Sequence, residues 1–141
     1  MKRISIIVLI LLTAVSLASL VSADGDNSNG YFIGLWEGMD INDGSLRTIS
    51  ITDNERDGVY AVSIYDTYWS LCGENRGAYH GTGTVGSDGW LHVNGTLNCH
   101  PSGTSTSLAI AYRPVRFSDT LIEEPGNEFL ESGNLHRISN R

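Results

Sequence analysis

Short runs of alternating apolar and polar residues, separated by glycine-containing turns, constrain this 141-residue chain most strongly. Residues 46–52, for example, place Ile49 and Ile51 on one face and hydroxyl side chains on the other. A two-residue period is typical of a strand with one buried face. No stretch repeats apolar residues with helical spacing over three turns. The sequence therefore predicts an all-β protein.

The predicted strands follow one another closely along the chain. After a first strand around Trp36, the runs cover residues 46–52, 59–66, 79–85, 90–97, 105–112, 116–123 and 135–138. Asp57-Gly58 and Gly86-Ser87-Asp88-Gly89 suit hairpin turns. Parallel pairing needs connections of about a dozen residues, so these strands must run antiparallel. We expect a single antiparallel up-and-down barrel of about eight strands, with a two-sheet sandwich as the alternative.

The first 23 residues have the organisation of an export signal. Lys2 and Arg3 precede an apolar run over residues 4–12, and the segment ends in the small residues Val21-Ser22-Ala23. The run is shorter than the roughly 20 residues of a membrane-spanning helix, and a retained anchor is the alternative interpretation. We expect a signal peptide over residues 1–23, a flexible leader over 24–30 and the barrel domain over 31–141. The protein would be secreted or periplasmic, with no membrane insertion after cleavage.

Charge bears on the partners of the predicted mature chain. It has sixteen acidic residues, seven arginines and no lysine, which gives a formal charge of −9. A negative field of this size repels phosphate groups, so nucleic acid and anionic lipid are disfavoured partners. In the simplest interpretation the acidity promotes solubility, and in the alternative it attracts a cationic partner or divalent ions.

Cys72 and Cys99 are the only cysteines. An exported chain meets an oxidising compartment, where two cysteines are expected to form a disulfide. Their spacing is not the Cys-x-x-Cys of a redox pair. Cys72 follows the third predicted strand and Cys99 the fifth, and alternate strands of a meander leave the barrel at the same rim. We therefore expect a structural bridge across one end of the barrel.

Gly34-Leu35-Trp36, in the first predicted strand, resembles the Gly-x-Trp motif that opens the calycins, the group of the lipocalins and avidins. In those proteins the tryptophan plugs one end of an eight-stranded barrel beneath an arginine from a late strand. The resemblance implies that Trp36 is the barrel-end plug and that Arg137 is its arginine. It does not imply biotin binding, because Glu37-Gly38-Met39 follow where avidins carry a ligand-contacting amide.

Histidines and carboxylates raise a metal hypothesis. His80 and His100 are expected near the disulfide rim, and Asp66 would add a carboxylate there, a donor set that zinc accepts. None of them has the His-x-His or His-x3-His spacing of a specific site, so ordinary rim roles are favoured and we expect no cofactor. No serine lies in a nucleophile elbow, so no catalytic residue is assigned.

Aromatic residues provide the predicted binding site. Tyr68 and Trp69 precede Cys72, where a disulfide would hold them rigid, and Trp90 opens a later strand. Aromatic side chains bury a large area at low entropic cost, which suits a ligand or protein surface. The alternative is that these aromatic side chains cap the barrel end and pack on the outside of strands.

These features predict a secreted, non-catalytic binding protein that holds a small apolar molecule or a protein surface at the barrel mouth. One alternative is a small extracellular hydrolase that uses rim histidines and carboxylates. Another is a structural envelope or matrix protein with a filled barrel. The inward side chains that would fill it are Ile49, Ile51, Val62, Ile64, Leu91, Val93, Leu108 and Ile110.

Asn94-Gly95-Thr96 is the one glycosylation sequon of the chain. It falls in a predicted strand. The sequence alone does not decide whether it is used.

Overall fold

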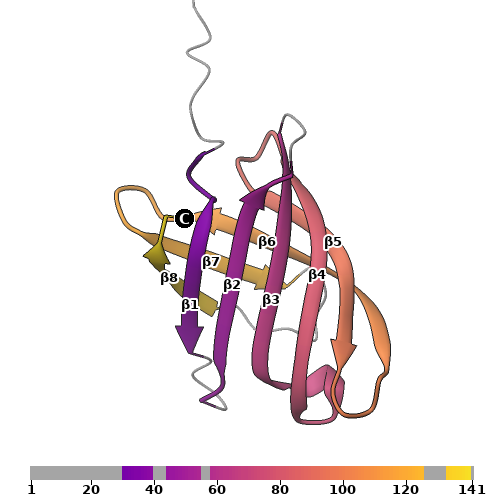
Figure 1. Cartoon of the computed structure of the whole chain (residues 1–141). Helices are drawn as coiled ribbons and strands as arrows, with labels where there is room; N and C mark the ends of the chain where they lie inside the picture. Colours follow the sequence, from indigo (N-terminus) through magenta and orange to yellow (C-terminus); the bar gives the residue numbers. More distant parts are fainter. Residues whose placement is uncertain (1–29, 40–43, 55–57, 126–132, 141) are drawn as a thin grey trace, which may run out of the picture.

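A computed structural model describes residues 30–39, 44–54, 58–125 and 133–140; the predicted signal peptide and nearly all of the predicted leader lie outside these ranges. Within them the chain forms eight strands and the short 3-10 helix η2 (Figure 1). In chain order the elements are β1 (Gly34–Met39), β2 (Leu46–Asp53), β3 (Val59–Trp69), η2 (Ser70–Cys72), β4 (Asn75–Val85), β5 (Leu91–Cys99), β6 (Ser105–Pro114), β7 (Thr120–Pro125) and β8 (Gly133–Ser139).

The eight strands form one closed barrel. Each strand pairs antiparallel with the next, and β8 returns to pair with β1. The predicted all-β class and the up-and-down order of eight strands are confirmed. Closure gives every strand two hydrogen-bonded neighbours, which removes the exposed edges that make open sheets prone to association.

Side chains fill the barrel interior. In the register between β2 and β3, Ile49 lies opposite Ile64 and Ile51 opposite Val62. All eight aliphatic residues predicted to face inward are buried, with exposures of 4% or less. Burying a large apolar side chain stabilises a protein by about 1.5–3 kcal/mol, so this interior is the main source of stability.

Two glycines make room for Tyr79 in the barrel. Gly81 of β4 and Gly95 of β5 are paired across the strands. A Cβ atom on Gly95 would lie 2.7 Å from Cζ of Tyr79, and one on Gly81 would lie 2.7 Å from the Tyr79 hydroxyl oxygen. Both distances are shorter than van der Waals contact, so the tyrosine ring occupies the space of two missing side chains.

Two strands begin four residues away from their predicted positions. β4 begins at Asn75 rather than at residue 79, because residues 75–78 pair with β3 and β5 although they lack the alternating pattern. β7 begins at Thr120 rather than at residue 116, because residues 115–119 form a turn. In that turn the Val115 N–H donates to the Thr120 carbonyl at 3.0 Å, and Phe117 has a φ of +62°.

The barrel has two different ends. At the disulfide end, β1, β3, β5 and β7 finish, and η2 leads from β3 into β4, as Figure 1 shows at the lower end of both strands. At the opposite end, called the Trp36 end, β2, β4, β6 and β8 finish.

Candidate functional site

Three charged residues form an ion cluster inside the barrel, towards its disulfide end. Nε of Arg47 donates to Oδ2 of Asp66 at 2.8 Å, and Nη2 lies 2.8 Å from the same oxygen. Nη1 of Arg47 donates to Oε1 of Glu123. The side chains of Asp66 and Glu123 are 0% and 1% exposed, and that of Arg47 is 14% exposed. One arginine therefore holds two buried carboxylates.

Two aromatic residues, Trp69 and Tyr112, lie beside this ion cluster. The guanidinium carbon of Arg47 lies 4.7 Å from the ring centre of Trp69, the last residue of β3. Tyr112 of β6 is the cross-strand partner of Glu123 and is fully buried. A guanidinium over an indole ring is attractive, and more so when both are desolvated.

Burial governs protonation in the cluster. Burial raises the pKa of Glu123, and the positive charge of Arg47 opposes this shift. Burial, followed by the negative charge of Glu123, raises the pKa of Tyr79 to about 12 and that of Tyr112 well above its ordinary value. Burial alone would lower the pKa of Arg47, but Glu123 and Asp66 together raise it. The tyrosines thus stay neutral and Arg47 stays charged near neutral pH, which suits a structural cluster better than proton transfer.

The aromatic residues predicted to bind a partner do not form one surface. Trp69 is 1% exposed because it faces inward and stacks on Arg47, so the prediction that it is a rim binding residue is wrong. Tyr68, beside it, is half-buried. Trp90 is half-buried in the connection from β4 to β5 at the Trp36 end, where the guanidinium carbon of Arg113 lies 5.1 Å from its ring centre.

The three candidate metal ligands lie in three different environments. Asp66 faces the interior and is held by Arg47. His80 lies in the middle of β4 on the outer wall, with its Nδ1 3.1 Å from Oγ of Ser63, so the prediction that it lies at the rim is wrong. His100 is exposed in the turn after β5. In the part of the chain that the structure describes, no three His, Cys, Asp or Glu residues are placed to hold a metal ion.

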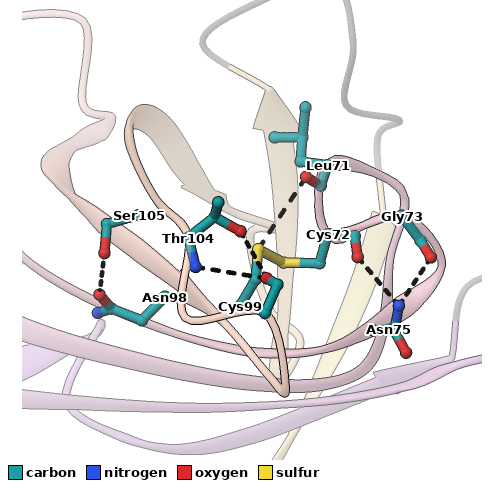
Figure 2. Close-up of a disulfide and its surroundings, with 9 residues drawn as sticks. Leu71, Cys72, Gly73, Asn75, Asn98, Cys99, Thr104 and Ser105 are labelled. Atoms are coloured by element: carbon teal, nitrogen blue, oxygen red, sulfur yellow. Dashed lines mark hydrogen bonds between the residues drawn. A yellow bond between two sulfur atoms is a disulfide. The ribbon is translucent and has the colours of Figure 1, made fainter.

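The predicted disulfide is present. It joins Cys72 of η2 to Cys99 at the end of β5, with the two Cα atoms 5.3 Å apart (Figure 2). Nδ2 of Asn75 donates to the carbonyl oxygens of Cys72 and Gly73 at 3.2 and 2.8 Å, and the Cys99 N–H donates to the Thr104 carbonyl at 2.8 Å. The bridge therefore ties together two connections that are already ordered by hydrogen bonds. A disulfide fits a protein of an oxidising compartment.

Arg137 covers Trp36 at the other end of the barrel. Its guanidinium carbon lies 4.1 Å from the Trp36 ring centre, and its terminal nitrogens donate to the carbonyl oxygens of Tyr31 and Ile33. Nε1 of Trp36 donates to the carbonyl oxygen of Phe32 at 2.9 Å, and the Trp36 side chain is fully buried. These contacts fill the Trp36 end with side chains.

An apolar patch that the sequence did not reveal lies on the outer wall at the disulfide end. It consists of Met39, Leu46 and Tyr65, which are 65%, 43% and 48% exposed. Met39 and Leu46 are direct partners between β1 and β2, and Tyr65 lies on the same wall of β3, opposite Thr48. Leu71 of η2, 36% exposed, lies at the same end. We call Met39, Leu46 and Tyr65 the apolar patch.

No family model matches this chain, and no curated protein and no solved structure shows significant similarity to it. Within residues 30–39, 44–54, 58–125 and 133–140, no helix is long and apolar enough to span a membrane.

Proposed function

We propose that this chain is a secreted, non-catalytic binding protein that holds an extracellular protein at the disulfide end of its barrel. The apolar patch is the observation that carries the proposal. Met39 and Leu46 are exposed cross-strand neighbours, and Tyr65 is exposed on the same wall. Large apolar side chains gathered on the surface of a small domain mark interaction sites. A barrel with a purely structural role does not need such a patch, because polar side chains on the outer wall are compatible with the same fold and are more soluble.

The patch rests on a rigid base. Leu46 precedes Arg47, the centre of the buried ion cluster, and its backbone N–H donates to Oγ1 of Thr67 on β3 at 3.1 Å. The disulfide fixes the neighbouring connection at Cys72. A surface that is ordered before binding loses less conformational entropy on association, which favours affinity.

A protein partner fits this barrel better than a small apolar ligand. Trp36, Tyr79 and Tyr112 are fully buried in the interior, beside the inward aliphatic residues. The formal charge of −9 in the predicted mature chain favours a partner whose apolar contact surface is surrounded by basic residues.

A relationship to the calycins is part of the proposal. It is supported by the closed eight-stranded barrel and by the position of Arg137 over Trp36. In this proposal the plugged Trp36 end is structural and the opposite end carries the binding surface.

Site-specific crosslinking tests the proposal. A photoreactive residue replaces Leu46 of β2 in protein secreted by its own source organism. A control protein carries the same photoreactive residue in place of the exposed Thr84 of β4, near the Trp36 end of the barrel. We expect a second extracellular protein to be captured from position 46 and not from position 84, and to be lost when Tyr65→Glu is added. Equal capture at both positions, or capture of only a second copy of this chain, would overturn the proposal.

A further inference from the structure

We infer that Asn94 is modified by an N-linked glycan on the outer wall of the barrel. Asn94-Gly95-Thr96 fits the acceptor pattern Asn-x-Ser/Thr. Asn94 and Thr96 lie in the middle of β5, and both are exposed. Residues two apart on a strand share a face, so the acceptor amide and the sequon hydroxyl both point away from the core.

Packing accounts for the middle residue of the sequon but not for the other two. A Cβ atom on Gly95 would lie 2.3 Å from the His80 carbonyl oxygen and 2.7 Å from Cζ of Tyr79, so this position requires glycine. Within the described residues the side chains of Asn94 and Thr96 make no hydrogen bond. The fold therefore needs Gly95, whereas it leaves Asn94 and Thr96 free for another purpose.

The wall around Asn94 has room for a sugar. The residues directly across from Asn94 are Thr82 on β4 and Ala109 on β6, and both are small. A sugar on the Asn94 amide would stand above these two residues without displacing a large side chain. Because the amide has no partner in the described structure, its modification also breaks no hydrogen bond.

The charge distribution supports the same inference independently. The outer faces of β3, β4, β5 and β6 carry no carboxylate, although the chain has sixteen acidic residues. The charged side chains on this wall are Arg76 at the disulfide end and Arg113 at the Trp36 end. A surface with about 25–35% charged residues favours solubility, because charge keeps the surface hydrated and keeps molecules apart. A glycan is bulky and solubilising, and would supply that hydration where the acidic residues are missing.

The modification must precede closure of the barrel. Asn94 lies in a central stretch of β5 whose backbone is paired with β4 on one side and β6 on the other. A paired backbone cannot bend into a transferase. During transfer Nδ2 of Asn94 forms a bond to C1 of the first sugar, the bond from C1 to a phosphate oxygen of a lipid-linked oligosaccharide breaks, and the lipid phosphate leaves with the electron pair. Nδ2 gives up one proton to a base of the transferase.

Mass spectrometry of the protein from its own source organism tests the inference. We expect the intact mass to exceed that of the polypeptide by the mass of one oligosaccharide. The added mass should lie on the peptide that contains Asn94. Asn94→Gln and the isosteric Thr96→Val should abolish the added mass, whereas Thr96→Ser should retain it. Asn134→Gln, an exposed asparagine of β8 outside any sequon, is the matched control and should leave it unchanged.

Each contrary result is decisive. A native mass equal to that of the unmodified polypeptide with one disulfide would overturn the inference, and so would sugar that persists in Asn94→Gln. All four substitutions are at exposed positions and should leave the fold intact. Equal melting temperatures of the unglycosylated wild type and variants would exclude misfolding as the cause of a lost glycan.

The order of events has its own test. Unmodified protein is offered to a transferase with its lipid-linked donor, either folded or reduced and unfolded. The unfolded chain should accept the glycan and the folded barrel should not. Equal acceptance would contradict transfer before barrel closure.

Discussion

Arg47 and Glu123, 76 residues apart in the sequence, form an ion pair across the inside of the barrel. Arg47 belongs to β2 and Glu123 to β7, which are not neighbours in the sheet. The pair therefore connects two parts of the barrel wall that backbone hydrogen bonds do not join. Asp66 completes the cluster from β3.

We predict that Arg47→Met destabilises the fold by about 3–5 kcal/mol, because it leaves two buried carboxylates without a counter-charge. Urea unfolding at neutral pH measures the loss. Arg113→Met, which removes an exposed arginine over Trp90, is the control and should cost no more than about 1 kcal/mol. Adding Asp66→Leu and Glu123→Leu to Arg47→Met should restore much of the stability, and similar losses in the single, control and triple variants would contradict a structural role for the cluster.

Glu123 should make stability depend on pH in a direction opposite to that of most carboxylates. Burial raises its pKa in the folded state above the ordinary 4.5, so the folded protein binds more protons than the unfolded chain between these two values. The stability contributed by Glu123 is then fully present below pH 4.5 and is lost as pH rises through the folded pKa. Unfolding free energies of the wild type and of Glu123→Gln, compared across pH, isolate this contribution. As pH rises, the unfolding free energy of the wild type should fall relative to that of Glu123→Gln. A rise relative to Glu123→Gln would contradict a raised pKa of Glu123 in the folded protein.

The disulfide should contribute about 3.5 kcal/mol on the chain-entropy account, since it links residues 27 apart in the sequence. The double variant Cys72→Ala, Cys99→Ala is expected to lose this amount in chemical unfolding. Reductant should destabilise the wild type to a similar extent and leave the double variant unaffected. A reductant effect on the double variant would show that another process is being measured.

Trp69→Ala should destabilise the protein by about 3–5 kcal/mol, as expected for a large buried side chain. Trp90→Ala removes the same side chain from a half-buried position and should cost clearly less. Thermal unfolding of the two variants gives the comparison. If Trp69→Ala were the milder change, Trp69 would be a surface residue after all.

Phe117→Gly should stabilise the fold by roughly 1 kcal/mol, although it removes an aromatic ring. Phe117 has a φ of +62°, a left-handed conformation that costs a residue with a Cβ atom about 1–2 kcal/mol, and its side chain is fully exposed. Arg116→Gly, next to it in the same turn, is the control and should destabilise through added freedom of the unfolded chain. A lower melting temperature for Phe117→Gly would mean that its ring makes contacts that stabilise the turn.

The alternation of residues was sufficient to predict the architecture, because a filled barrel obeys the same two-residue period along every strand. Ile49, Ile51, Val62 and Ile64 face inward as expected. Cys72 and Cys99 could be paired because the meander brings alternate strand ends to one rim. Where glycine replaced the apolar residue, as at Gly77, the pattern disappeared and the start of β4 was missed.

The candidate site was less predictable, because polar residues inside a barrel look like turn or rim residues in the sequence. Asp66 and Glu123 occupy inward positions of their strands, but their partner Arg47 lies on a different strand and no local pattern joins them. Trp69 lies five residues after the inward Ile64, so a regular two-residue period would place it on the outer face. The irregular pairing between Asp66 and Trp69 turns it inward instead. The apolar patch combines residues from three strands, so only the strand register could assemble it.

Pairing of β1 with β8 sets the order in which the barrel can fold. Nη1 of Arg137 donates to the Ile33 carbonyl oxygen, 104 residues earlier, so β1 cannot pair with β8 until almost the whole chain has been synthesised. Hairpins of the intervening strands form from local contacts, but closure depends on a contact of high sequence separation and is therefore slow. Until the final strand emerges, β1 has an unpaired edge that other nascent chains could bind. Arrival of the last few residues thus ends the period in which the protein is most at risk of aggregation.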